Sequence, residues 1–459
     1  MICSIKGLEN VKNIHFIGIG GSGMFPMASI LKCKGFNITG SDVYESDTLQ
    51  KVRDLGIKVF VGHDAQNVKG ADIVVYSAAI KQSNPEIVAA QELNIKTIER
   101  SVMLGIITSS YPNSIAVSGT HGKTSTTSMI TSILIDAQKS PTAIIGGTLP
   151  KINGNSCIGK SDTIVCEACE YVDSFLKLHP TISVIQNVEA DHLDYFKTFE
   201  NFKNSFRKFA NQTSKLLVVN GDDVNAREVV KESTAEKIFY GFSKDNEYYI
   251  DNLTFDKRQF PSFTIVKNGE PLFDVCLSVP GRHNIYNALA AAIVAINSGV
   301  DYQTVASSLK NFRGAHRRFE ILFNKDGIVV ADDFAHHPTE IKNILSTAMN
   351  MGFKRVWVVF QPHTFSRTFL FLDQFAEVLS IADRVVLSEI LPVREVNTYN
   401  IYSEDLAKKI PGCVCLKTFD EITDFILKNV SSGDLVLTMG GGNIYKCANS
   451  IVSKLQNLK

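Results

Sequence analysis

The sequence predicts an α/β protein of three domains built on parallel sheets. Short apolar runs of strand length alternate with helical stretches along most of the chain. Glycine-rich loops follow two of the expected strands, and 459 residues exceed what one hydrophobic core usually serves. Turn clusters and changes of pattern divide the chain into domains at 1–109, 110–316 and 317–459.

Composition narrows the class of protein. The 47 basic and 47 acidic side chains give a formal net charge of zero, which argues against a nucleic-acid partner or an anionic membrane surface. No apolar stretch is long enough for membrane insertion, no secretory leader is recognisable, and the nine cysteines are scattered. We expect a cytoplasmic protein, monomeric or weakly dimeric, that acts on small molecules.

The first domain alternates expected strands with helices over 24–34 and 86–93, and the strands lie at 14–17, 36–39, 59–61 and 73–76. The first strand leads into Gly18-Ile19-Gly20-Gly21-Ser22-Gly23, which matches the dinucleotide fingerprint, and Asp42 follows the second strand at the separation of a ribose contact. A diphosphate on a helix N-terminus satisfies this pattern in NAD and in a nucleotide sugar such as a UDP-linked one. Both ligands stay open.

The second domain begins with a phosphate loop. A buried strand at 114–117 leads through Gly119-Thr120-His121-Gly122-Lys123-Thr124 into a helix over 125–136. In such a loop the backbone amides wrap the phosphates of ATP, the Lys123 ammonium reaches the outer two, and the Thr124 hydroxyl coordinates Mg²⁺. The loop is a shortened variant, because Val117 stands where the general pattern has glycine.

Two later strands of this domain end in polar residues. Glu167 ends the strand at 163–166, and Asp191-His192 follows the strand at 182–186. In a parallel sheet these ends share an edge with the Lys123 loop, so Thr124, Glu167 and His192 form one expected Mg²⁺ ligand set. Antiparallel hairpins are expected between Tyr248 and Val279, followed by a helix over 284–298.

Strand and helix alternation resumes in the third domain, with strands at 328–331, 356–360, 385–388 and 435–439. Two polar segments follow strands, Asp332 to Pro338 and Gln361 to Arg367, and we expect them to be adjacent loops facing one crevice. They suit a small zwitterion whose carboxylate pairs with Arg367 and whose amine lies near a histidine.

Several motifs in the same order resemble the Mur ligase family of bacterial cell-wall synthesis. They are Gly18 to Met24, Gly119 to Thr124, Glu189-Ala-Asp-His192, Gly281-Arg-His-Asn284 with Asn287, Arg317 to Glu320, Asp332 to Pro338 and Phe360 to Arg367. The resemblance covers nearly the whole chain. It implies a Rossmann-like N-terminal domain for a UDP-sugar, a central P-loop ATPase-like domain with a parallel sheet and a small antiparallel one, and a C-terminal Rossmann-like domain.

The resemblance also implies roles for individual residues. UDP-sugar binding falls to Gly20, Gly21, Ser22, Gly23, Met24 and Asp42. For MgATP, the resemblance implies phosphate contacts from Gly119, Thr120, His121, Gly122, Lys123, Thr124 and Ser125, and metal contacts from Glu167 and His192. The adenine side falls to His283, Asn284 and Asn287. Arg318 would contact the γ-phosphate and Asp332 the ribose. L-alanine is framed by His336, His363 and Arg367.

The implied activity is an ATP-dependent ligation of L-alanine to the lactyl carboxylate of UDP-N-acetylmuramate through an acyl phosphate. Lys123, Arg318 and Mg²⁺ would stabilise the transferring phosphoryl group, and either His192 or His336 would accept the proton of the amine. Three alternatives are carried forward. They are a ligase that attaches a recycled murein peptide to the same sugar, an NAD-dependent oxidoreductase, and a nucleotide-binding regulatory protein without catalysis.

Overall fold

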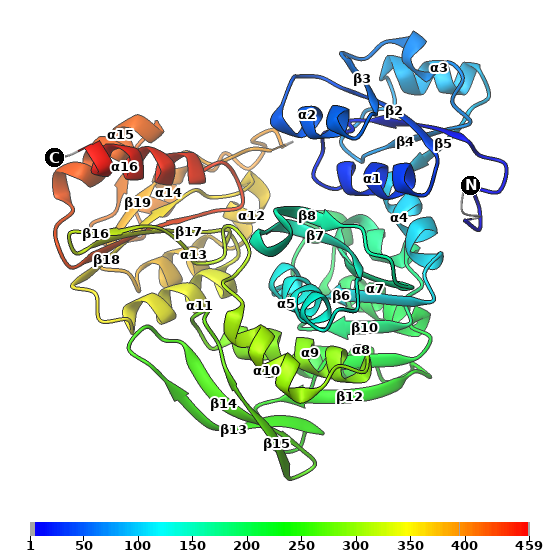
Figure 1. Ribbon diagram of the computed structural model, residues 1–459. Helices are drawn as coiled ribbons and strands as arrows, with labels where there is room; N and C mark the ends of the chain where they lie inside the picture. Colours follow the sequence, from blue (N-terminus) through cyan, green and yellow to red (C-terminus); the bar gives the residue numbers. More distant parts are fainter. Residues whose placement is uncertain (1–4, 394, 458–459) are drawn as a thin grey trace. The chain divides into compact units, whose positions relative to one another are not determined.

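The computed structural model describes residues 5–393 and 395–457, which form two compact units (Figure 1). The first unit runs to Tyr249 and includes Leu289–Val305, and the second contains Ile250–Ala288 and the chain from Ala306 onward. Parallel sheets flanked by helices occur in both units, so the predicted α/β class is confirmed. The domain limits after residues 109 and 316 stay a prediction.

The N-terminal sheet has five parallel strands in the order β3-β2-β1-β4-β5. Its strands are β1 (Asn13–Ile17), β2 (Asn37–Asp42), β3 (Lys58–Val61), β4 (Ile73–Tyr76) and β5 (Lys96–Glu99). The order reverses direction between β1 and β4, and ligands of open α/β sheets bind outside the carboxyl ends of the strands at such a point. The glycine loop after β1 lies at this position.

Helices cover both faces of this sheet because its strand residues alternate between two apolar clusters. Ile17 and Val74 face the cluster that contains α3, whereas Phe16 and Val75 face the cluster that contains α1 and α4. The helical elements are α1 (Phe25–Cys33), α2 (Asp47–Asp54), the 3₁₀ turn η1 (Ala65–Val68), α3 (Pro85–Glu92) and α4 (Arg100–Ser109).

The central sheet places the phosphate-loop strand in its middle, with the order β12-β11-β10-β6-β9-β7-β8. The strands are β6 (Asn113–Ser118), β7 (Thr142–Leu149), β8 (Gly154–Cys157), β9 (Thr163–Glu167), β10 (Ile182–Ile185), β11 (Leu216–Asn220) and β12 (Glu236–Gly241). All pair in parallel except β8, which runs antiparallel to β7. The carboxyl ends of β6, β9 and β10 therefore meet at one edge, as predicted.

Helices and short turns connect these strands. They are α5 (Lys123–Asp136), η2 (Pro150–Ile152), η3 (Tyr171–Lys177), α6 (Leu193–Phe196), α7 (Phe199–Gln212) and α8 (Val224–Val229). The expected hairpin region is confirmed as β13 (Tyr248–Phe255), β14 (Pro261–Lys267) and β15 (Glu270–Cys276), with β14 and β15 antiparallel. Two helices follow, α9 (His283–Asn297) and α10 (Tyr302–Asn311).

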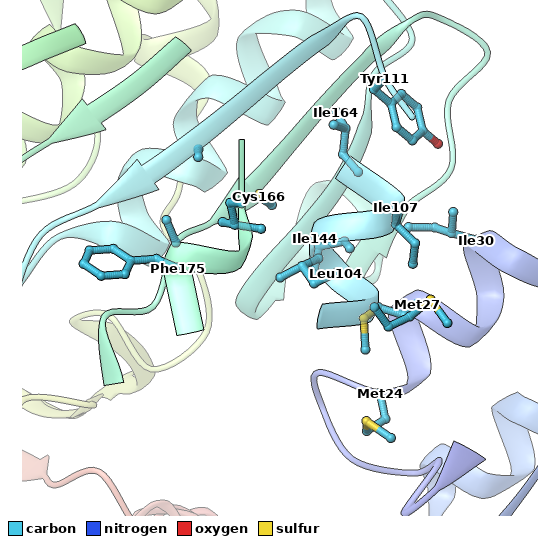
Figure 2. Close-up of a cluster of buried hydrophobic side chains, with 14 of the residues drawn as sticks. Met24, Met27, Ile30, Leu104, Ile107, Tyr111, Ile144, Ile164, Cys166 and Phe175 are labelled. Carbon is cyan, nitrogen blue, oxygen red and sulfur yellow. The ribbon is translucent and has the colours of Figure 1, made fainter. Parts of the chain in front are cut away.

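The N-terminal and central sheets of the first unit share one apolar core (Figure 2). Met27 and Ile30 of α1 lie on one side of α4, whose Leu104 and Ile107 extend the cluster toward Ile164 on β9 (Figure 2). Each such side chain stabilises the fold by about 1.5–3 kcal/mol relative to an exposed position. The glycine loop after β1 and the phosphate loop after β6 consequently belong to one packed body.

The C-terminal sheet of the second unit has the order β16-β17-β21-β18-β19-β20, in which only β16 is antiparallel. Its strands are β16 (Glu320–Lys325), β17 (Ile328–Asp333), β18 (Arg355–Phe360), β19 (Arg384–Leu387), β20 (Val414–Cys415) and β21 (Asp434–Met439). We expected the loops after β17 and β18 to be neighbours, and this is wrong, because β21 lies between the two strands.

Helices pack on both faces of this sheet, with α11 and α13 in one apolar cluster and α15 and α16 in the other. The helices are α11 (Pro338–Met349), α12 (Phe365–Leu370), α13 (Leu372–Leu379), α14 (Ser403–Ala407), α15 (Phe419–Asn429) and α16 (Tyr445–Asn457). In the described part of the chain, none of the helices combines the length and the apolar character that crossing a membrane requires.

Candidate active site

The glycine loop after β1 is held by backbone hydrogen bonds to the end of β2. The amides of Gly18 and Ile19 both donate to the carbonyl of Ser41, at 2.8 and 3.0 Å. Gly18 has φ 80°, in the left-handed region where glycine is favoured. The carbonyl of Ser22 accepts a hydrogen bond of 2.7 Å from Asn155 on β8, so the central sheet also fixes this loop.

Asp42, at the end of β2, lies against the same loop. Its Oδ2 accepts a hydrogen bond of 2.9 Å from the Gly20 amide, and its Oδ1 accepts one of 2.8 Å from the Val43 amide. Met24 is 1% exposed and packs in the shared core, and its Cγ lies 3.5 Å from the position of a Cβ on Gly21, so its side chain supports the loop from the core side (Figure 2). The binding roles of Asp42 and of the segment from Gly20 to Met24 stay predictions.

The phosphate loop after β6 docks on the segment that follows β10. The Thr120 amide donates to the carbonyl of Asn187 at 3.1 Å, and the His121 amide donates to the Asn187 side chain at 2.8 Å. Gly119 has φ 134° and approaches Gln186 so closely that a Cβ there would lie 2.8 Å from the Gln186 Cβ. Gly122, with φ 85°, starts α5. Both glycines are therefore required by the backbone.

Lys123 at the start of α5 turns back into the loop. Its Nζ donates to the Gly119 carbonyl at 2.6 Å and forms an ion pair with Glu170 Oε2 at 2.9 Å. The Lys123 side chain is 16% exposed and that of Glu170 is 2% exposed. Burial alone would lower the pKa of Lys123, but the Glu170 carboxylate outweighs burial and raises it, so the ammonium is charged.

Sequence reasoning missed Glu170, the carboxylate that pairs with Lys123. It follows β9 by three residues and also lies 3.9 Å from the Nε2 of His192. Glu167, the residue predicted as a metal ligand, instead accepts a hydrogen bond of 2.5 Å from the Gly146 amide on β7. The signal that was available is the second acidic residue in Cys166-Glu-Ala-Cys-Glu170, immediately after a buried strand.

The donor set around Lys123 fits Mg²⁺, which prefers oxygen ligands. Glu170 and Asp191 flank His192, whose Nε2 lies 3.6 Å from Asp191 Oδ2. Thr124 is 7% exposed, and its methyl group lies 3.1 Å from the position of a Cβ on Gly147, the neighbour of Gly146. The structure therefore brings Thr124, Glu167 and His192 to one edge, and adds Glu170 to the residues that would hold the ion.

In the second unit, Arg317 organises the loops at the carboxyl edge of the sheet. Its guanidinium donates to Asp332 Oδ2 at 2.8 Å and to the carbonyls of Gly442 and Gly440 at 2.8 and 2.7 Å. Asp332 is 1% exposed and also accepts from Thr438 at 2.5 Å. Asp332 is therefore an internal ion-pair partner here, and its contact with an ATP ribose stays a prediction.

Arg318, the arginine predicted at the γ-phosphate, lies with its guanidinium carbon 5.1 Å from the centre of the Phe334 ring. The adenine-side residues lie at the start of α9, where Asn287 donates to Asn284 at 3.0 Å. Burial and the Arg318 charge lower the pKa of His283 to about 4, against the influence of Glu340. The structure thus brings Arg318 and His283 into electrostatic range of each other, and their nucleotide contacts stay predictions.

The three residues predicted to frame L-alanine lie together. The rings of His336 and His363 have centres 5.3 Å apart, and Arg367 Nη1 lies 3.1 Å from His363 Nδ1. His336 Nδ1 lies 2.9 Å from the Phe334 carbonyl oxygen. Because a carbonyl oxygen can only accept a hydrogen bond, Nδ1 carries the proton, and Nε2 of the neutral ring is the atom that can accept one. Burial lowers the pKa of His336 to about 3, and the positive charge of Arg367 acts in the same direction.

A third glycine loop, absent from the predictions, allows this contact across β21. Gly440, Gly441 and Gly442 follow β21, and a Cβ on Gly441 would lie 3.1 Å from His336 Cγ and 3.3 Å from His363 Cδ2. Without side chains the loop leaves room for the two histidines to meet above it. The run Met439-Gly-Gly-Gly-Asn443 after an apolar strand was the available signal.

Comparison with known proteins matches this architecture along the chain. Family models described as "Mur ligase family, catalytic domain", "Mur ligase middle domain" and "Mur ligase, glutamate ligase domain" match residues 13–112, 117–295 and 317–442. The chain is 45% identical over 449 residues to the UDP-N-acetylmuramate--L-alanine ligase of Agathobacter rectalis, covering 96% of this chain and 98% of the relative. The Acetivibrio thermocellus protein of the same name is 42% identical, with 99% and 98% covered.

A solved structure gives the same result for the fold. The UDP-N-acetylmuramate-alanine ligase MurC of Thermotoga maritima superposes with a TM-score of 0.83 at 30% sequence identity. The match covers 98% of this chain and all of that one.

Proposed function

The chain belongs to the Mur ligase family, and we propose that it joins L-alanine to the lactyl carboxylate of UDP-N-acetylmuramate as ATP is converted to ADP and phosphate. Relatives of 42% and 45% identity over nearly the whole chain carry this activity in their names. The observation that carries the proposal is the cluster of His336, His363 and Arg367, which offers one cation and two imidazole rings to a small zwitterion.

The reaction has two steps. A lactyl carboxylate oxygen attacks the γ-phosphorus of ATP, and ADP leaves. The amine nitrogen of L-alanine then attacks the acyl carbon, phosphate leaves, and the nitrogen loses a proton. Lys123 would stabilise the negative charge of the transferring group, because it is a buried ammonium fixed at the start of α5. Mg²⁺ held by Thr124, Glu167, Glu170 and His192 would neutralise phosphate charge.

L-alanine binding would itself activate its proton acceptor. The Arg367 charge lowers the pKa of His336, and a substrate carboxylate paired with Arg367 would offset that charge and raise the pKa again. His192 lies among carboxylates and in the expected metal set, so we assign the proton to His336. The cytoplasmic location, a monomeric or weakly dimeric state and the role of Arg318 at the γ-phosphate remain parts of this proposal.

The alternatives are less well supported. An oxidoreductase would leave the buried Lys123–Glu170 pair without a role. A nucleotide-binding regulatory protein would bind MgATP through the same loop and release no phosphate with any acceptor. A ligase for recycled murein peptide shares the sugar and differs in the acceptor. The relatives of 42% and 45% identity are named for L-alanine, which favours the amino acid.

The test is phosphate release from MgATP with UDP-N-acetylmuramate, with and without L-alanine. Glycine, L-serine and a tripeptide that begins L-Ala-γ-D-Glu are run in parallel. We expect release only when both the sugar nucleotide and L-alanine are present. Preference for the tripeptide would show that the protein is the ligase for recycled murein peptide. Absence of phosphate release with every acceptor would refute the proposal that the protein is a ligase.

A further inference from the structure

We propose that Arg100 is a further substrate-binding residue, whose guanidinium pairs with the diphosphate of UDP-N-acetylmuramate. The inference rests on the proposed function, because it takes a uridine diphosphate to be the ligand of the first glycine loop. It adds a cation to a site in which the resemblance otherwise places the loop from Gly20 to Met24 and the Asp42 carboxylate, next to the N-terminus of α1. Three observations in the first unit support it.

The first observation is the position of Arg100 in the sheet. It is the first residue of α4, directly after β5, and it therefore lies at the carboxyl edge of the N-terminal sheet. The glycine loop after β1 lies at the same edge, and β4 alone separates β1 from β5. Anionic ligands of such sheets bind across this edge at the switch point between β1 and β4.

The second observation is direct contact between Arg100 and the glycine loop. A Cβ built on Gly23 would lie 2.9 Å from Arg100 Nη1 and 3.2 Å from Arg100 Cδ. Gly23 immediately precedes Met24 and the start of α1, where the amides of a helix N-terminus face a bound phosphate. The guanidinium therefore lies beside the position that the diphosphate would occupy.

The third observation is that the Arg100 guanidinium has no hydrogen-bond acceptor and no ion-pair partner in the described part of the chain. The first unit contains four arginines, and three of them are held by acceptors within the unit: Arg53 by Glu45, Arg207 by Glu200, and Arg227 by Asn246. Over residues 5–393 and 395–457, no group accepts a hydrogen bond from Arg100 or forms an ion pair with it. A half-buried guanidinium with five donors and no acceptor is suited to an anion that arrives with the ligand.

Arg100 lies near both the glycine loop after β1 and the segment that pairs with the phosphate loop after β6. Arg100 lies within electrostatic range of the Cys169 thiol, which precedes Glu170, the partner of Lys123. A cation at this place would face the diphosphate on one side and the segment beside the ATP loop on the other. The same substrate carries a second anion, its lactyl carboxylate, and the experiment separates the two.

The experiment measures binding by isothermal titration to the unaltered full chain and to the full chain carrying Arg100→Ala or Arg100→Lys, with no L-alanine present. The ligands, each titrated alone, are uridine, UDP, UDP-N-acetylmuramate and, as a control for the second nucleotide site, MgATP. Lys96→Ala is the matched control, because Lys96 is an exposed cation at the opposite end of the same strand β5. We expect Arg100→Ala to weaken UDP and UDP-N-acetylmuramate at least tenfold and to leave uridine and MgATP within twofold, with partial recovery in Arg100→Lys.

Unchanged UDP affinity in Arg100→Ala would overturn the proposal, and a loss confined to UDP-N-acetylmuramate would assign Arg100 to the lactyl carboxylate instead. Equal weakening of uridine, UDP and MgATP would show a purely structural role. Failure of the unaltered protein to bind any uridine compound while it binds MgATP would refute the proposed function itself. That result differs from a failure of Arg100 alone, in which the unaltered protein binds UDP.

Discussion

Replacement of Glu170 by glutamine tests whether the buried ion pair with Lys123 forms in solution. Unit charges 2.9 Å apart attract by about 6 kcal/mol at an effective dielectric constant of about 20. Desolvation of both groups offsets part of this, and loss of one partner from a buried pair typically costs about 3–5 kcal/mol. Glutamine retains a hydrogen bond worth about 1 kcal/mol, so we expect a net loss of about 2–4 kcal/mol.

Scanning calorimetry measures this loss as a lower Tm of the first unit. A change of 1 kcal/mol shifts the Tm of a domain of this size by about 2–4 °C, so the fall should be about 5–15 °C. Trp357, the one tryptophan of the chain, lies on β18 of the second unit and provides an internal reference. Its fluorescence transition should keep its midpoint in Glu170→Gln.

A double-mutant cycle with Lys123→Met isolates the pair. Lys123→Met should itself destabilise the first unit, because it leaves the Glu170 carboxylate buried without its partner. The two changes together should then be less harmful than the sum of the single changes, with a coupling of about 2–4 kcal/mol. A coupling below about 0.5 kcal/mol would refute the ion pair as a feature of the free protein.

Three further predictions concern the active site. Lys123→Ala should lower kcat at least 100-fold and leave the Kd of UDP-N-acetylmuramate, measured by titration calorimetry, within twofold. An equal loss of turnover and of UDP-N-acetylmuramate affinity would contradict separate sites for the two nucleotides. Arg367→Ala should raise the KM of L-alanine at least tenfold in phosphate-release assays, whereas an effect on the KM of ATP alone would remove Arg367 from the amino-acid pocket. The pKa of about 3 for His336 lies below the ordinary value, so the unfolded chain binds more protons and stability falls as pH decreases from about 6.5. Between pH 6.5 and 5 the free energy of unfolding should fall by about 2 kcal/mol, as followed by Trp357 fluorescence. In His336→Gln this pH-dependent fall should disappear. If the variant shows the same pH dependence as the unaltered protein, His336 is not a buried neutral imidazole.

The sequence predicted the fold wherever a local pattern determines an element. The glycine loops at Gly18 and Gly119 follow strands as expected, because a strand that feeds a helix through a tight turn needs glycine at positive φ. The hairpins after Tyr248 were likewise predicted from short runs separated by turns. Strand order in the C-terminal sheet was beyond this reasoning, because β21 is far in sequence from the strands β17 and β18 that it separates.

The candidate site was predicted to a similar extent. His336, His363 and Arg367 were expected to gather, and they do. Glu170 was missed because it lies three residues beyond the end of β9, outside any regular element, where spacing along the chain does not determine which side chain meets Lys123. Arg317 was read as part of a motif, but its ion pair with Asp332 is a tertiary contact between a turn and a strand end. Residue types alone carry no information on such contacts.

The packing of α4 between α1 and the central sheet limits how this chain can be rearranged. Gly105 of α4 approaches η3 so closely that a Cβ there would lie 2.1 Å from the Lys177 carbonyl oxygen. A chimera that takes residues 1–109 from a relative must therefore bring a small residue at this position and a matching surface on η3 and β9. Residues 1–109 and the segment up to η3 must therefore come from the same parent. A chimera that exchanges the first domain between relatives should place its boundary after residue 177 rather than near residue 110.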